Sequence, residues 1–278
     1  MENIVPFPEF DVKNMSLAKL RSLDNGGKVV SMFYKMPSGD QKMLTLQTPE
    51  MSCPYGLSKW DNDGKGPAKY TLDLSFKGYE SRDAVKKFFQ GLSDFDSALL
   101  DNGLSRSEEF FKRKYSSKDV VEALYTSVVR RSKDDKYPPT FKMTIPYDHA
   151  TGEFRCKAFD KVTKEPLDFN SINLKGAKVT AIVQCTGVWI AGGKFGSTWK
   201  ALQLRVEQSA KIADYAFRDI DGDAAADVAE DADEDDNASD IIKDAPHAIK
   251  HTDELVESSD DDLEAAPSKK TVPRGGRR

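Results

Sequence analysis

Hydrophobic and polar residues alternate in two runs between Lys178 and Val206. In the first run, Val179, Ala181, Val183 and Cys185 fall on one parity, and Lys178, Thr180, Gln184 and Thr186 fall on the other. In the second run, Leu202, Leu204 and Val206 alternate with Trp199, Ala201, Gln203 and Arg205. A period of two is typical of half-buried strands. Since Gly192, Gly193 and Gly196 allow the chain to reverse between the runs, the pattern predicts a long β-hairpin.

The tip of this predicted hairpin is glycine-rich, basic and aromatic, with Trp189, Lys194, Phe195, Trp199 and Lys200. Trp199 and Arg205 share the parity opposite to the apolar row, which places both on the solvated face. A flat ring beside a cation on such a face suits a stacked nucleic-acid base and its phosphate. For any one ring, the alternative that it belongs to the hydrophobic core stays open.

Other patterns divide the rest of the chain into strands around a helical segment. Strand patterns occur at residues 29–35, 42–48, 70–76, 140–145 and 153–159. Residues 81–131 have helical spacing, and we predict three helices there. The first ends near Asp101, and Ser105 with Glu108 has the capping-box spacing that opens the second. The third follows residues 120–128, and a short closing helix is predicted for 209–217.

Two further segments combine cations with aromatic rings. Tyr55, Lys59 and Trp60 lie in a loop whose order of residues resembles that of 195–200, and Lys69 begins the strand that follows. Two such loops could line one groove, although so short a likeness also arises by chance. Arg155, Lys157 and Phe159 share one face of a predicted strand. The alternative for these three is an ordinary solvated strand face.

Charge is distributed unevenly along the 278 residues, which carry a net charge of −5. Residues 219–264 contain nineteen Asp and Glu against two Lys, a net −17. The last fourteen residues add +5, so residues 1–218 carry +7. A basic body favours a polyanionic partner, and the acidic tail favours a regulatory role. Because the tail has few large apolar residues, we expect it to be disordered.

Several classes of function lack their sequence signals. Cys53, Cys156 and Cys185 are odd in number and far apart, which favours a reducing, intracellular setting without disulfides or a cysteine metal site. No membrane-length apolar run and no signal peptide are recognisable. There is no phosphate-binding loop, dinucleotide fingerprint or nucleophile elbow. We therefore expect a protein that is not an enzyme, with no catalytic residues, no metal and no cofactor.

Two stretches carry a resemblance to a known family. They are residues 54–58 with the strand 69–75, and residues 187–189 with 193–200. On these motifs the chain resembles the single-stranded DNA-binding proteins of nucleocytoplasmic large DNA viruses, the type found in African swine fever virus, giant viruses and algal viruses. The resemblance covers roughly residues 28–210. It implies an OB-like barrel and sequence-tolerant binding of single strands in viral replication, recombination or repair. The acidic tail also resembles those of phage and bacterial single-strand binders, but here it ends in a basic segment, 269–278.

The predicted fold is α+β: an N-terminal arm (1–27), an OB-like antiparallel β-barrel with a helical insertion (28–218), and a disordered acidic tail (219–278). The predicted binding residues are Tyr55, Lys59, Trp60, Lys69, Arg155, Lys157, Phe159, Trp189, Lys194, Phe195, Trp199, Lys200 and Arg205. The predicted partner is single-stranded DNA, with RNA as an alternative and replication proteins recruited by the tail. The expected location is the site of viral replication in the host cytoplasm or nucleus, or the virion. A competing hypothesis is an acidic chaperone or scaffold for basic proteins.

Overall fold

The computed structural model describes residues 3–24, 26–61, 66–132 and 136–208. The predicted hairpin is confirmed as its longest pair of strands, β16 (Lys178–Ala191) and β17 (Lys194–Glu207). The turn residues Gly192 and Gly193 have φ angles of 54° and 75°. Such positive values at both central positions match a two-residue hairpin turn, which strongly favours glycine. The predicted apolar row of β16, Val179 to Cys185, is buried.

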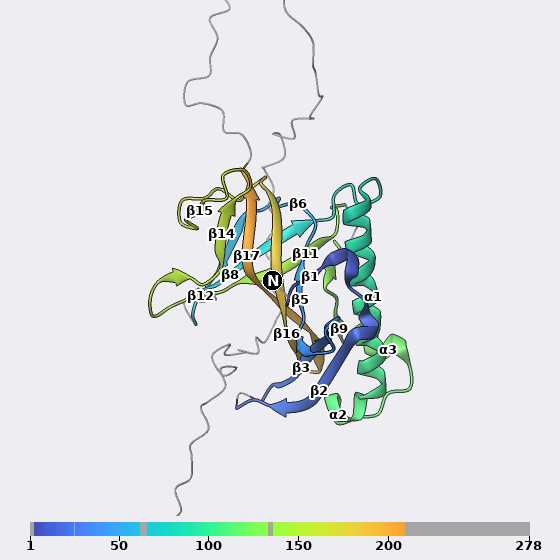
Figure 1. The fold of residues 1–278 in the computed structure, drawn as a ribbon. Helices are drawn as coiled ribbons and strands as arrows, with labels where there is room; N and C mark the ends of the chain where they lie inside the picture. Colours follow the sequence, from blue (N-terminus) through green and yellow to red (C-terminus); the bar gives the residue numbers. More distant parts are fainter. Residues whose placement is uncertain (1–2, 25, 62–65, 133–135, 209–278) are drawn as a thin grey trace, which may run out of the picture.

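The other strands assemble around this hairpin into one mixed sheet with helices on one side, an α+β arrangement (Figure 1). The strands of the first half are β3 (Lys28–Lys35), β4 (Gln41–Met43), β5 (Thr45–Gln47), β6 (Met51–Ser52), β7 (Leu57–Trp60) and β8 (Lys69–Ser75). Those of the second half are β9 (Tyr125–Thr126), β10 (Val129–Arg130), β11 (Thr140–Ile145), β14 (Lys157–Asp160) and β15 (Pro166–Leu167). A separate two-stranded sheet joins β12 (Tyr147–Asp148) to β13 (Glu153–Phe154).

Five strands of the sheet are neighbours in a ring. β16 pairs with β6, β6 with β8, β8 with β11, β11 with β17, and β17 with β16. Two of these contacts are single residue pairs, Ser52 with Ser75 and Thr144 with Lys200. The ladder is therefore not continuous around the ring, and the predicted OB-like barrel is not confirmed. The antiparallel part of that prediction is wrong, because β17 runs parallel to β9, β11 and β14.

The N-terminal segment is more regular than the predicted arm. It contains β1 (Val5–Pro6), two short 3₁₀ turns η1 (Phe7–Glu9) and η2 (Val12–Asn14), and β2 (Met15–Ser22). β1 pairs with β5, and β2 pairs with β3. Pro6 is tolerated because it lies in the edge strand β1, where the missing N–H does not interrupt a central ladder.

Three helices occupy the predicted helical segment: α1 (Asp83–Ser105), α2 (Ser107–Phe111) and α3 (Lys118–Ala123). The predicted capping box is wrong, since the Ser105 hydroxyl donates to the Asn102 carbonyl and Arg106 precedes α2 without a side-chain cap. The third helix is shorter than predicted, because the chain turns into β9 and β10. No helix among the described residues is long and apolar enough to cross a membrane.

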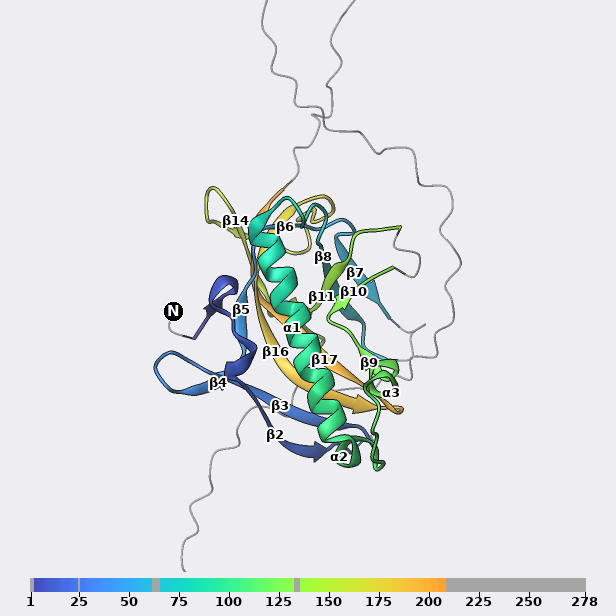
Figure 2. The same cartoon turned by 90° about the vertical axis from the view of Figure 1, so that its right-hand side faces the viewer.

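Helix α1 covers the inner face of the sheet (Figure 2). Phe88 meets the Phe141 ring edge-on at 5.7 Å, and Phe95 lies 5.3 Å from Trp199. Gly103 allows α1 to approach Phe195 of β17 closely, because a Cβ at this position would lie 2.6 Å from the Phe195 ring. This packing excludes water from the side of the sheet that faces α1, and no helix of the described residues covers the opposite side.

A buried carboxylate fixes the chain that follows α3. Asp96 of α1 accepts hydrogen bonds from the Tyr125 hydroxyl at 2.7 Å, the Val128 amide at 3.0 Å and the Ser127 hydroxyl. A buried charge is tolerated only when such donors satisfy it. The contact joins the middle of α1 to the segment between β9 and β10.

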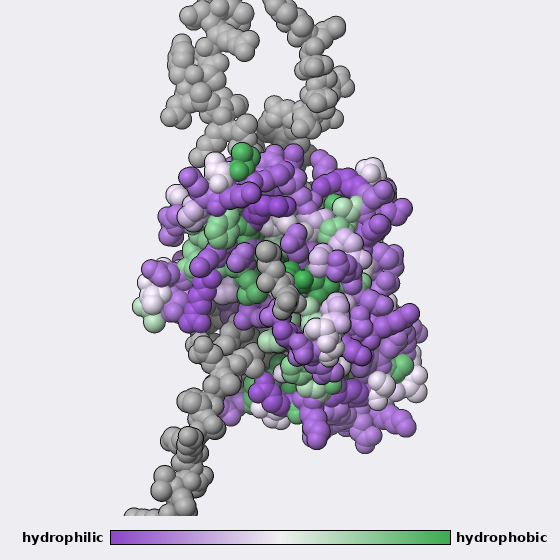
Figure 3. All heavy atoms as spheres, viewed as in Figure 1, coloured by the Kyte–Doolittle hydropathy of each residue, from purple (hydrophilic) through white to green (hydrophobic). Residues whose placement is uncertain are grey.

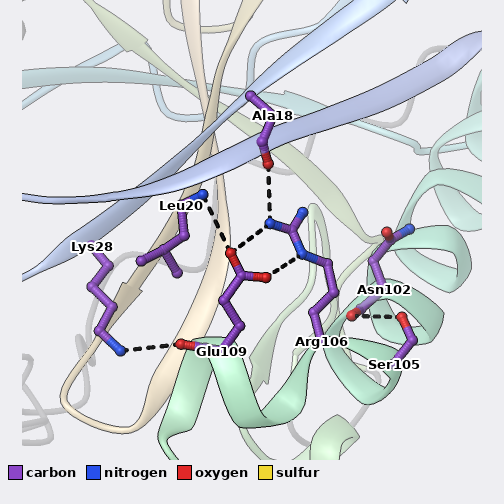
Figure 4. Close-up of polar contacts among 7 residues, drawn as sticks. All are labelled: Ala18, Leu20, Lys28, Asn102, Ser105, Arg106 and Glu109. Atoms are coloured by element: carbon purple, nitrogen blue, oxygen red, sulfur yellow. Dashed lines mark hydrogen bonds and ion pairs between the residues drawn. The ribbon is translucent and has the colours of Figure 1, made fainter.

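A second polar cluster attaches α2 to the edge of β2 (Figure 4). The Arg106 guanidinium donates to both carboxylate oxygens of Glu109 and to the Ala18 carbonyl, at 2.8–3.0 Å. Glu109 in turn accepts a long hydrogen bond from the Leu20 amide, and the Arg106 contact lowers its pKa. Lys28 donates to the Phe110 carbonyl at 2.8 Å. Together these contacts hold the β2–β3 pair against the helices.

Candidate nucleic-acid interface

The sheet face opposite to α1, here called the outer face, is polar and crosses six strands. One row of register partners runs from Ser58 through Thr71, Thr144, Lys200 and Gln184 to Thr45. Side chains of register partners lie on the same face. The row therefore places Lys200, a predicted binding residue, in the middle of the outer face.

A β-bulge decides which residues of β17 reach this face. Ile182 pairs with Gln203, and Val183 pairs with Ala201, so Leu202 has no partner in β16. One extra residue reverses the alternation of side chains. Lys200, Gln203 and Arg205 consequently face outward, whereas Trp199, Ala201 and Leu204 are buried.

The bulge overturns the prediction for Trp199. Its ring is 2% exposed and contacts Phe95 and Phe141 in the core. Phe195 is fully buried against Phe110, Phe111 and Tyr125, so its predicted role is wrong as well. In this fold neither ring can stack on a base, and the alternative that these aromatic residues belong to the core is confirmed for both.

Phe159 and Arg205 lie beside each other on the outer face, as register partners in β14 and β17. Arg205 also pairs with Thr180 of β16, and its Nη2 donates to the Thr180 hydroxyl at 3.1 Å. A hollow of about 260 Å³ opens at this point. It is lined by Gln47, Phe159, Asp160, Lys164, Thr180, Ile182, Gln203, Leu204 and Arg205. In Figure 3, hydrophobic residues gather over β14 and β17 within a hydrophilic border.

Positive charge surrounds this hollow. Lys157 pairs in register with Gln203, and Lys164 lines the hollow from the turn after β14. Asp160 is the one carboxylate in the lining, and the amides of Thr163 and Val162 donate to it and lower its pKa. Asp160 keeps its negative charge, but Lys157, Lys164 and Arg205 outnumber it around the hollow, so the net charge there favours a polyanion.

A second cationic group lies at the other end of the outer face, on β8, β10 and β11. Trp60 is 43% exposed and pairs with Lys69. Lys142 pairs with Asp73, and Arg130 of β10 pairs with Thr140. Burial and the Arg130 guanidinium lower the pKa of Lys142, and Asp73 opposes them. A ring and three cations therefore flank the polar row at this end.

The remaining predicted residues lie apart from these two groups. Lys59 pairs with Tyr70 and points to the face opposite to Trp60. Tyr55 is 57% exposed in the loop before β7, and Arg155 forms a 3.0 Å ion pair with Asp148. Trp189 is half-buried against Gly196, and Lys194 lies at the hairpin tip. The two similar loops therefore do not line one groove, because Phe195 and Trp199 have turned inward.

Sequence reasoning missed several residues of the outer face, chiefly Gln47, Thr180, Ile182, Gln203, Lys164, Lys142 and Arg130. Thr180 fell on the correct polar parity of β16, so alternation alone could have found it. Gln203 shares the parity of Arg205 and could have been found in the same way. The positions of the other residues depend on how segments far apart in the chain pack together. No group of three or more His, Cys, Asp or Glu that could hold a metal ion occurs among the residues the structure describes.

Comparison with known proteins gives distant relatives. Residues 84–219 match a family described as "Family of unknown function (DUF5871)". The uncharacterized protein L291 of Acanthamoeba polyphaga mimivirus is 24% identical over 180 residues. That match covers 62% of this chain and 27% of the relative's length. A relation to a giant-virus protein is thus found, whereas membership of the predicted family of viral single-strand binders is not confirmed.

Among solved structures, the chain is similar to the single-stranded DNA-binding protein of bacteriophage Enc34 in complex with single-stranded DNA. The TM-score is 0.39 at 10% identity, over 70% of this chain and 97% of that one. It is also similar to gp2.5, a single-stranded DNA-binding protein encoded by bacteriophage T7. There the TM-score is 0.38 at 14% identity, over 63% of this chain and 98% of that one. Because both TM-scores are low, neither structure carries an argument about what this chain binds.

Proposed function

We propose that the outer face binds single-stranded DNA with little dependence on sequence. The observation that carries the proposal is the hollow in which Phe159 and Arg205 lie side by side. A ring offers a stacking surface to any base, and a guanidinium offers five donors to phosphate or base edges. Gln47 and Gln203 add amide groups that can both donate and accept.

The order of groups across the outer face supports a path for single-stranded DNA along the polar row. Phe159, Arg205 and Lys157 lie at one end, Lys200 lies in the middle, and Trp60 with Lys69 lies at the other end. Cations beside well-separated rings are the arrangement that proteins use to track a single strand. A duplex would present its phosphates but would hide the faces of its bases.

Further properties belong to the same proposal. The ring of five neighbouring strands is compatible with an OB-like core, and the giant-virus relative supports a viral setting. We assign the protein to replication, recombination or repair of viral DNA, in a binding role without catalysis. Replication proteins are the partners proposed for the acidic tail. RNA is the main alternative ligand, because stacking on a ring does not distinguish the two sugars.

The direct test measures the full-length protein with single-stranded DNA, duplex DNA and RNA of one length by fluorescence anisotropy. We expect the tightest binding to single-stranded DNA, since its bases are free to stack. The logarithm of affinity should fall with the logarithm of salt concentration, with a slope of about −0.7 per phosphate neutralised. Equal affinity for duplex and single strand would contradict stacking in the hollow, and tighter binding of RNA would transfer the proposal to that ligand.

The acidic tail gives a further prediction. Residues 219–278 lie outside the described residues, but residues 219–264 carry −17 and are tethered to a body of +7. Tethering gives the tail an effective concentration at the basic face that can reach the millimolar range. Removing 219–278 should therefore raise the affinity for single-stranded DNA several-fold at low salt, and the gain should shrink as salt screens the competition.

The basic end of the tail supplies the control. Deleting only 265–278 removes five positive charges and leaves the acidic run intact. This shorter deletion should lower the affinity, while the longer deletion raises it. Unchanged binding by both truncations across a salt series would show that the tail does not compete, and would favour its role as a docking site for another protein.

A further inference from the structure

Two successive guanidinium groups, that of Arg130 in the edge strand β10 and that of Arg131 directly after it, lie on opposite sides of the sheet. Arg130 pairs with Thr140 and therefore belongs to the outer face. The next residue, Arg131, has its guanidinium 5.5 Å from the centre of the Phe89 ring on α1. β10 pairs only with β11 among the described residues, and it lies beside α1 (Figure 2). The edge thus connects the outer face with a surface on the helix side.

This helix-side surface, formed by Tyr79, Lys86, Phe89, Arg131 and Tyr137, is aromatic and basic. Tyr79 stacks on Phe89 with ring centres 4.5 Å apart. Lys86 is exposed one helical turn before Phe89. Tyr137 is 53% exposed, with the Lys136 ammonium 5.5 Å from its ring centre.

The members of this surface are held together by the backbone around them. The Phe76 amide donates to the Pro139 carbonyl at 2.9 Å. This hydrogen bond holds the segment that carries Tyr137 next to the turn that carries Tyr79. The Tyr137 amide donates to the Ser132 hydroxyl at 3.3 Å, which joins that segment to Arg131. The rings and cations therefore form one surface, although they come from three separate parts of the chain.

Ion pairs neutralise only some of the cations among the described residues. Arg106, Lys118 and Lys161 each form an ion pair with a carboxylate. Within the described residues, Lys86, Arg131 and Lys136 form none. Contact with Phe89 explains the position of Arg131 as packing, whereas the Tyr137 ring and the Lys136 side chain beside it are exposed among the described residues.

We infer that the helix-side surface binds the stretch of the same single strand that leaves the outer face at β10. The inference rests on the proposed function and extends its site. Arg130 would contact the strand on the outer face, and Arg131 and Lys86 would neutralise phosphates after the strand crosses the edge. Tyr137 would offer a second ring for a base. A single strand can make this turn because its backbone is flexible, whereas a duplex is stiff over such a length.

The test is a length series of single-stranded oligonucleotides bound by the full-length protein and by Lys86→Gln/Arg131→Gln. With the shortest strand that binds, both proteins should have equal affinity. With longer strands, affinity of the unmodified protein should continue to rise, while the variant should reach its plateau earlier and bind about 3- to 10-fold more weakly. Its salt slope should be smaller by about 0.7 for each phosphate that the variant no longer neutralises.

The matched control is Lys112→Gln/Lys114→Gln, which removes the same charge from exposed positions between α2 and α3. It should follow the unmodified protein at every length. Since Arg131→Gln also removes the packing of its guanidinium against Phe89, Lys86→Gln alone provides a variant that keeps this packing, and its weaker binding of long strands should persist.

Two outcomes overturn the inference while the proposed function stands. In one, the Lys86/Arg131 variant binds every length as the unmodified protein does, although Phe159→Ala weakens all of them. In the other, the control variant loses as much affinity for long strands, so that overall charge explains the effect. Failure of the unmodified protein to bind any single strand would instead reject the proposed function and the inference together.

Discussion

Replacing Trp199 with alanine should lower the free energy of unfolding by about 3–5 kcal/mol, the cost of removing a large buried ring. The ring is 2% exposed and fills the space between Phe95 of α1 and Phe141 of β11. No small movement of a helix and a strand can close that space, so a cavity should remain. Chemical denaturation followed by circular dichroism would measure the loss.

Trp60→Ala is the control, because Trp60 is 43% exposed at the outer face and its removal should change stability by no more than about 0.5 kcal/mol. The two tryptophans should thus separate stability from binding. A Trp199→Ala variant that keeps its stability but loses single-stranded DNA binding would contradict the core position of Trp199. That result is what the alternation of residues in β17, taken alone, predicts.

Replacing Phe159 with alanine should weaken single-stranded DNA binding by about 1–3 kcal/mol, the usual contribution of one stacked base. The fold should tolerate the change, since Phe159 is only half-buried beside an open hollow. Arg205→Gln should weaken binding of all sequences alike and reduce the salt slope, because a phosphate contact carries no sequence information. Titration at several salt concentrations separates the two effects.

A ring and a cation from the other end of the molecule provide the matched control. Arg113 lies 5.7 Å from the Tyr115 ring centre, and both residues belong to the connection between α2 and α3. This connection lies far from β14 (Figures 1 and 2). Tyr115→Ala and Arg113→Gln should leave binding unchanged. If Phe159→Ala binds as tightly as these controls, the hollow is not where a base stacks, and the proposed function loses its main support.

Much of the architecture could be predicted from local patterns. Alternation gave the β16–β17 hairpin and the buried parity of β16, and helical spacing gave a helical segment between strands. These predictions succeeded because the side-chain period is fixed by local backbone geometry. The arm and the third helix were predicted less well. β1 and β9 are ordered by strands distant in sequence, β5 and β17. β2 and β10 pair with the next strand along the chain, β3 and β11, but their patterns did not predict strands.

The candidate site depends on information that no single segment contains. Phe159 and Lys157 were correctly placed on one face of their strand, but their position beside Arg205 follows from the parallel pairing of β14 with β17. Gln47 reaches the same hollow only because β5 pairs with β16. Register between distant strands is set by the packing of the whole sheet, so it could not be obtained from the spacing of residues.

The sequence by itself determined which residues of β17 alternate, the basic charge of residues 1–218 and the acidic charge after them. Only the tertiary structure decided which parity faces the core. Leu202 is skipped in the pairing with β16, and this single extra residue turns Trp199 inward and Arg205 outward. Because strand side chains repeat every two residues, a shift of one residue exchanges the two faces. The inward position brings the Trp199 ring against Phe95 of α1 and Phe141 of β11, contacts that alternation along one strand cannot reveal.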